Sequence, residues 1–181
     1  MTRVVREDAM AYEPENRVAD IITAAGGRLA SRVRLQKIAY LLDKLGAESG
    51  FSYTYHHYGP YSRDLDSAIL DAEAFDKIEE KFERRKSDGA RYSVFLSKIR
   101  NDAYDYSFLA RPELRARVLE LASVNVTVLE LAATAHWLFK EEKVSDWKAE
   151  IVRRKGSKTE GGRLDDATRL LGRIGLEPAT A

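Results

Sequence analysis

Three histidines and one close pair of acids are the side chains best suited to acid–base or metal chemistry at neutral pH. His56 and His57 are neighbours in a β-rich stretch, where successive side chains point to opposite faces and cannot readily bind one metal together. His136 lies on the flank of an apolar helical face, where a hydrogen-bonded structural role is the more common outcome. Asp64 and Asp66, two residues apart in a predicted helix, lie on different sides of it. The sequence therefore indicates no metal site and no catalytic residue.

Other catalytic signatures are absent from the chain. There is no cysteine among the 181 residues, which excludes disulfides, thiolate catalysis and cysteine metal sites. The glycine pairs Gly26-Gly27 and Gly161-Gly162 lack the spacing of phosphate-binding loops, and no G-x-S-x-G nucleophile elbow occurs. We therefore expect a protein that is not an enzyme and that needs no cofactor. An enzymatic site assembled from distant residues near His136 stays an alternative.

A basic cluster between residues 81 and 91 is the strongest nucleic-acid signal. The formal net charge of the whole chain is only +1, whereas dedicated nucleic-acid binders usually carry a strong basic excess. The helix predicted over residues 62–76 holds five acids against Arg63, and DNA phosphates would repel it. A basic hairpin can contact a DNA backbone or an acidic partner, or it can be a solvated turn, and these alternatives stay open. The basic residues of this cluster are Lys81, Arg84, Arg85, Lys86 and Arg91.

Four tyrosines crowd one short stretch of the chain: Tyr53, Tyr55, Tyr58 and Tyr61. Tyrosine offers a large contact area with a polar tip, which suits protein interfaces. The same side chains equally suit a seam between a strand and the helices behind it. The sequence leaves both interpretations open.

Helical and strand periodicity alternate along the first half of the chain, and the second half is helical. We expect helices over residues 15–25 and 31–45, a strand over 51–58 that ends at a Gly59-Pro60 break, a helix capped by Ser62, a hairpin formed by 78–85 and 91–97 around Asp88-Gly89, and later helices that begin near Pro112, Thr127, Ser145-Asp146 and Leu164. Thr127 to Glu130 matches a capping box. The order helix, helix, strand, helix, hairpin is that of a winged helix-turn-helix.

These elements predict a mainly α (α+β) protein with a winged-helix-like core, a β-hairpin and a C-terminal helical extension. We expect a disordered tail over residues 1–14, a single domain over 15–176 and a short C-terminal tail over 177–181. The apolar stretch 124–139 is too short and too polar to span a bilayer, and the first residues are too acidic for a signal peptide. The expected location is therefore the cytoplasm, with no membrane partner.

Two segments go beyond general helix patterns. The first is LQKIAYLL (35–42) followed by YGPYSRDL (58–65), and the second is LELAATAHW (129–137). An LQK-x-x-Y helix followed by a YGP turn resembles the Panacea-domain family of SocA-like antitoxins. The fuller YGPYS and LELAATAHW segments are most similar to the uncharacterised YwgA-like relatives of that family. The resemblance extends from about Arg17 to Leu176.

The resemblance implies a non-enzymatic module that binds a protein partner by direct contact, as an antitoxin with a cognate toxin or as a proteolytic adaptor. It implies no catalytic role for the motif positions. The alternative is a winged-helix DNA-binding regulator that uses the basic hairpin. The residues that match family motif positions, and that we therefore expect to take part in partner binding, are Gln36, Lys37, Tyr40, Tyr58, Gly59, Pro60, Tyr61, Ser62 and His136.

Overall fold

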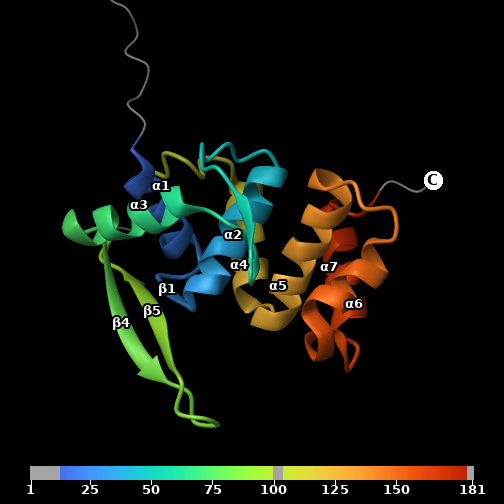
Figure 1. Cartoon of the computed structure of the whole chain (residues 1–181). Coiled ribbons are helices and arrows are strands. Elements are labelled where there is room, and N and C mark those ends of the chain that lie inside the picture. The colour runs from blue at the N-terminus through green and yellow to red at the C-terminus, as the bar shows by residue number, and fades with distance from the viewer. Residues whose placement is uncertain (1–12, 100–103, 179–181) are drawn as a thin grey trace, which may run out of the picture.

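The computed structural model describes residues 13–99 and 104–178, which form a mainly helical α+β protein (Figure 1). The helices are α1 (Pro14–Ala24), α2 (Arg32–Lys44), α3 (Arg63–Ala74), α4 (Pro112–Ser123), α5 (Val126–His136), α6 (Trp147–Lys155) and α7 (Arg163–Ile174), with a π-helical segment η1 (Trp137–Glu141) and a 3-10 segment η2 (Gly156–Thr159). The strands are β1 (Arg28–Ala30), β2 (Thr54–His56), β3 (Gly59–Tyr61), β4 (Ile78–Arg84) and β5 (Arg91–Ser97).

The first half of the chain forms a winged-helix core. Helices α1, α2 and α3 accompany a three-stranded antiparallel sheet of order β1-β5-β4, in which β1 comes from between α1 and α2 and the other two strands follow α3. The hairpin β4–β5, paired from Ile78↔Ser97 to Arg84↔Arg91, projects from the helices as the wing (Figure 1). The predicted fold class is thereby confirmed. The sequence missed β1, because a three-residue strand directly after two glycines is too short to show alternation.

The Gly59-Pro60 dipeptide does not break a strand, so the prediction of one strand over 51–58 is wrong. Strand β2 turns through His57 and Tyr58 into β3, and Tyr55 pairs with Pro60. Gly59 adopts a φ of +85°, which L side chains rarely adopt and glycine tolerates. The small β2–β3 sheet therefore holds Tyr58 at the tip of a tight turn.

The second half of the chain is the predicted helical extension. Helix α4 packs on α1 and α2, while α5 packs between α2 and α7. Pro112 begins α4 and Asp146 caps α6, as predicted. The predicted cap of α5 at Thr127 is wrong, because the Asn125 side chain accepts the backbone N–H groups of Thr127 and Val128. Helix α5 runs on into η1, where the Glu142 N–H reaches back five residues to the Trp137 carbonyl at 3.1 Å.

The buried side chains of the core and the extension form one continuous apolar cluster. Within the described ranges, no helix combines the length and the apolar character that crossing a bilayer requires. Of the predicted N-terminal tail over residues 1–14, residues 1–12 lie outside the described residues. Glu13 directly precedes α1, and Pro14 is the first residue of that helix. Of the predicted C-terminal tail, Glu177 and Pro178 are described and follow α7 without regular structure.

Candidate partner-binding groove

Helix α2 buries its polar face as well as its apolar face. Gln36 and Tyr40 lie on this helix, and Gln36 is 3% and Tyr40 0% exposed. Gln36 exchanges two hydrogen bonds of 2.8 Å with the backbone of Ser62, donating to its carbonyl and accepting its N–H. The Ser62 hydroxyl in turn caps α3 by accepting the Leu65 N–H. This pair therefore fixes where α3 begins relative to α2.

Lys37 is an unusual buried cation. Its side chain is 1% exposed and its ammonium donates to the carbonyl of Pro60. Burial lowers the pKa of Lys37 to about 7; the Glu130 carboxylate opposes this shift, and the Lys155 and Lys158 ammoniums add to it. Lys37 thus ties β3 to α2, and near neutral pH its charge is only partly retained.

Tyr40 and His136 join α2 to the end of α5. The Tyr40 hydroxyl and His136 Nδ1 lie 2.8 Å apart in the interior. Burial is the main cause that lowers the pKa of His136 to about 4, and burial raises the pKa of Tyr40. Both side chains are therefore neutral at pH 7, and their hydrogen bond is one between uncharged groups.

Gly59 lies directly against α5. A Cβ added at this position would approach Thr134 Oγ1 to 2.3 Å, so only glycine fits. Most of the motif positions singled out in the sequence therefore meet in the interior, where they bind one another and the backbone. We call this set the polar seam: Gln36, Lys37, Tyr40, Gly59, Pro60, Ser62 and His136. None of these residues lines the groove described next, so any effect on partner binding there is through the positions of their neighbours.

Above the polar seam lies a groove of 530 Å³ between the wing and the extension. Tyr58 is 53% exposed, and the Lys158 ammonium lies 4.8 Å from the centroid of its ring. Arg85 and Arg91 of the wing line the same groove. The full lining is Ala30, Ser31, Val33, Arg34, Tyr58, Arg85, Arg91, Tyr92, Val126, Thr127, Glu130 and Lys158. The structure thus brings Tyr58, which the sequence assigned to binding a protein partner, together with Arg85 and Arg91, which it assigned to the DNA-binding alternative.

The groove is basic, with one buried acid. Glu130, 4% exposed, accepts Lys155 Nζ at 2.9 Å and Lys158 Nζ at 3.0 Å. Arg85 pairs with Asp88 at 2.8 Å, and both side chains are exposed. Arg91 stacks over Phe82, with its guanidinium carbon 3.8 Å from the ring centroid. Exposed guanidinium groups beside tyrosine rings suit a carboxylate-bearing ligand segment.

The other predicted site residues lie outside the groove. Lys81, Arg84 and Lys86 are exposed on the wing but do not line it. Tyr61 is partly buried and donates to Asp66 Oδ2 at 2.7 Å, and Asp66 also accepts from Gln36 at 3.0 Å. In the parts of the chain that the structure describes, no three His, Asp or Glu side chains gather as metal ligands would.

Sequence reasoning missed the half of the groove that comes from the extension. Lys155, Lys158 and Glu130 come together from α5, α6 and η2, at separations of 25 and 28 residues. No local sequence pattern predicts a cluster of residues that lie so far apart in the chain. Tyr92 was recognised only as part of an alternating strand, and its hydroxyl donates to Glu83 Oε2 at 2.8 Å on the wing.

Comparison with known proteins finds distant similarity to an uncharacterised protein. No protein-family model matches the chain. The chain is 27% identical over 108 residues to the uncharacterized protein YwgA of Bacillus subtilis (strain 168). That alignment covers 60% of this chain and 64% of YwgA, so the similarity spans less than two thirds of that protein. The chain is thus distantly similar to YwgA, in keeping with the YwgA-like resemblance of its motifs.

Proposed function

We propose that this protein is a non-enzymatic, cytoplasmic binding module that holds an acidic segment of a partner protein in the groove. The observation that supports the proposal is the convergence of Tyr58 with Arg85, Arg91 and Lys158 around one hollow. Exposed tyrosine and arginine side chains are the residues most enriched at the energetic centres of protein interfaces. The polar seam beneath them provides a rigid support for Tyr58, since Lys37 and Gly59 anchor β3.

The outer face of α3 supports a protein partner over DNA. In winged-helix proteins the third helix usually enters the major groove. Here that helix exposes three acids, Asp64, Asp71 and Glu73. It also carries two exposed apolar side chains, Leu70 (61% exposed) in the helix and Phe75 (66% exposed) directly after its last residue. Acidic groups on this face would repel DNA phosphates, whereas a mixed acidic and apolar face is compatible with contact to another protein.

Binding of a defined acidic peptide tests the groove. A fluorescein-labelled peptide of alternating Glu and Leu, and a Gln-for-Glu version of it, are titrated at 50 mM and 300 mM salt with anisotropy as the readout. We expect the acidic peptide to bind more tightly, and added salt to weaken it, because the groove carries exposed arginines. The partner itself is sought by co-purification from the native host and by co-expression with neighbouring reading frames.

Two double variants with the same loss of charge provide the control. Arg85→Gln with Lys158→Gln removes two cations that line the groove, while Lys81→Gln with Lys86→Gln removes two exposed cations beside it. The first variant should weaken both the acidic peptide and any co-purified partner by about tenfold, and the second should change them little. Equal weakening by the two variants would contradict the groove as the binding site.

The same variants separate the DNA-binding alternative. Phosphate contacts along the wing would weaken more in the Lys81→Gln, Lys86→Gln variant, because it removes two of the five basic residues of the wing, whereas the groove variant removes only Arg85 from the wing. A mobility shift on the gene's own upstream DNA that the Lys81→Gln, Lys86→Gln variant reduces more than the groove variant does would favour a regulator. No shift at low salt would remove that alternative.

The antitoxin or proteolytic-adaptor role is the finer part of the proposal. It is supported by the resemblance of the LQK-x-x-Y and YGP segments to the Panacea-domain family. Growth arrest by a neighbouring reading frame, relieved by this chain and not by its Arg85→Gln, Lys158→Gln variant, is the expected result. A partner that is unaffected in its activity or its turnover by this protein would contradict both roles.

A further inference from the structure

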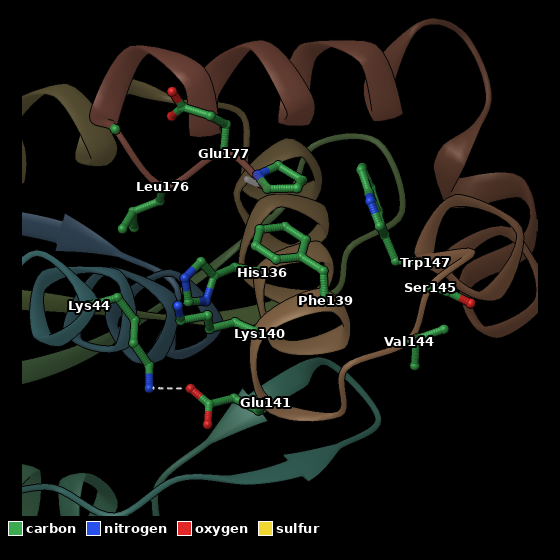
Figure 2. A pocket seen from close by; sticks show the side chains of 12 residues that line it. Lys44, His136, Phe139, Lys140, Glu141, Val144, Ser145, Trp147, Leu176 and Glu177 are labelled. Atoms are coloured by element: carbon green, nitrogen blue, oxygen red, sulfur yellow. Dashed lines mark hydrogen bonds and ion pairs between the residues drawn. The ribbon is translucent and has the colours of Figure 1, made fainter. Parts of the chain in front are cut away.

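A second pocket opens at the other end of α5. Val126 at the start of α5 lines the groove, while His136 at its end lines a pocket of 710 Å³ that shares no residue with the groove. Volumes of this size are typical of small-molecule sites. The pocket is lined by Lys44, His136, Phe139, Lys140, Glu141, Val144, Ser145, Trp147, Gly175, Leu176, Glu177 and Pro178 (Figure 2).

Aromatic rings form one wall of this pocket. His136 packs edge-on against Phe139 with centroids 5.2 Å apart, and Phe139 packs edge-on against Trp147 at 5.7 Å. Figure 2 shows these three rings in succession, with Leu176 on the C-terminal stretch beyond them. Phe139, Lys140 and Glu141 lie in the π-helix η1. This backbone geometry is rare in proteins overall, and where it does occur it is often found at functional sites. The wall suits a flat apolar ligand.

His136 offers the pocket one oriented hydrogen-bond donor. The Tyr40 hydroxyl has no other acceptor among the described residues, so it donates to His136 Nδ1. A neutral imidazole that accepts at Nδ1 carries its hydrogen on Nε2. Nε2 has no hydrogen-bond partner in the described part of the chain, although the side chain is only 3% exposed. A ligand in the pocket would therefore need an acceptor.

The charges at the rim specify the acceptor further. Lys44 forms an ion pair with Glu141, drawn as the dashed line in Figure 2. Lys140 is exposed and has no acidic partner within the described residues. Of the two acids that line the pocket, Glu141 pairs with Lys44, and Glu177 pairs with no cation of the described residues. We propose that this pocket binds a small aromatic carboxylate, whose ring lies against Phe139 and Trp147 and whose carboxylate accepts from His136 Nε2 and pairs with Lys140.

An NMR titration tests this proposal with a built-in reference signal. The chain has two tryptophans, so its spectrum holds two indole N–H signals. Trp147 lines the pocket, whereas the Trp137 indole donates to Glu142 at 3.0 Å and does not line it. We expect 2-naphthoate to shift the Trp147 signal saturably, with a smaller effect on Trp137. The neutral counterpart 2-naphthamide should bind at least tenfold more weakly.

Single variants assign the two charged contacts. Lys140→Gln should weaken 2-naphthoate about tenfold and leave 2-naphthamide unchanged, while Lys143→Gln, an exposed neighbour outside the lining, should do neither. Glu177→Gln should tighten 2-naphthoate, because it removes the opposing carboxylate. His136→Phe keeps a ring of similar size and should weaken both probes, and its fold is checked by the Trp137 signal. No saturable shift of Trp147, equal affinity for the two probes, or equal effects of the two lysine variants would overturn the proposal.

Discussion

His136 illustrates how the environment of one residue decides its role. The sequence placed it on the flank of an apolar face, and the structure buries it at 3% exposure with its Nδ1 bonded to Tyr40. No local pattern could reveal the partner, because Tyr40 lies 96 residues earlier in the chain. The type of residue was visible in the sequence, whereas the hydrogen bond depends on how α2 and α5 pack.

Stability should depend on pH through His136. The folded state holds the pKa of this imidazole at about 4, below the ordinary value of 6.5. Between these values the unfolded chain binds more protons, so the free energy of unfolding rises with pH through this window and falls as pH drops to 4. The loss from this group amounts to about 3 kcal/mol at 1.4 kcal/mol per unit.

Urea unfolding of the wild type and of His136→Gln at pH 4 and pH 7 measures this contribution. The free energy of unfolding of the wild type should exceed that of His136→Gln by more at pH 7 than at pH 4, because only the wild type carries the buried imidazole. The carboxylates are present in both proteins, so their contributions cancel in this comparison. A difference that does not change with pH would show that His136 is not buried as a neutral group.

Gly59→Ala should destabilise the fold for two separable reasons. The φ of +85° penalises any side chain, and the new Cβ would lie 2.3 Å from Thr134 Oγ1. Gly89→Ala on the wing is a matched control, because its φ is +68° and nothing lies within 4 Å of the added Cβ. We expect a cost of about 1 kcal/mol at Gly89 and about 3 kcal/mol at Gly59, measured by chemical denaturation.

Adding Thr134→Ala to Gly59→Ala should recover the steric part of the cost and leave the backbone part. Equal destabilisation by Gly59→Ala and Gly89→Ala would mean that the close approach between β3 and α5 is absent in solution.

At the scale of elements, local patterns predicted helices well and short strands poorly. Helix α7 was predicted to begin near Leu164 and begins at Arg163, and its apolar residues at regular helical spacing, Ala167, Leu170, Leu171 and Ile174, are buried. The wing was predicted from two alternating runs around Asp88-Gly89, and its strands pair over their full length. Strands β1 and β3 hold three residues each, which is too short to show alternation. The partner of β1 is the distant strand β5, and β3 begins with the Gly59-Pro60 dipeptide that favours a turn.

The start of α5 gives a direct comparison of the predicted and observed caps. The Asn125 side chain accepts the Thr127 N–H at 2.9 Å and the Val128 N–H at 3.4 Å. Asn125→Ala should therefore lower the free energy of unfolding by about 1 kcal/mol, whereas Thr127→Ala should change it by less than half of that. Thermal or urea unfolding checks the pair, and the reverse order would restore Thr127 as the cap.

At the scale of the whole molecule, the extension completes the core of the winged helix. Tyr40 and Lys37 on α2 are buried because α5 and the β2–β3 sheet cover them. The sequence indicated one domain from its unbroken patterning, but it could not show that α2 is covered on two sides. Winged helices that stand alone need an exposed polar face on this helix, and here the corresponding side chains lie in the polar seam.

Removal of α5, α6 and α7, the part of the extension beyond α4, should therefore abolish folding of the winged helix. We expect a chain of residues 1–124 to lack a cooperative unfolding transition, and the full chain to unfold in a single step. Circular dichroism and near-ultraviolet signals from the tyrosines should then change together. A folded 1–124 fragment, or two separate transitions in the full chain, would show that the predicted single domain is two.

The π-helical segment Trp137–Glu141 carries one more residue per closed turn than an α-helix. Loss of one residue here would let the segment close as an ordinary α-helical turn, and the chain beyond it would keep nearly the same direction relative to α5, because the π turn absorbs the extra residue. The Tyr40–His136 bond, which precedes this point, would survive such a deletion, while Phe139 within the segment would turn away from its present neighbours, because successive residues rotate by a larger angle in an α-helix than in a π-helix. Length variation at this single position among homologous sequences should therefore sort chains that keep the aromatic wall from chains that have lost it, without any structure being determined.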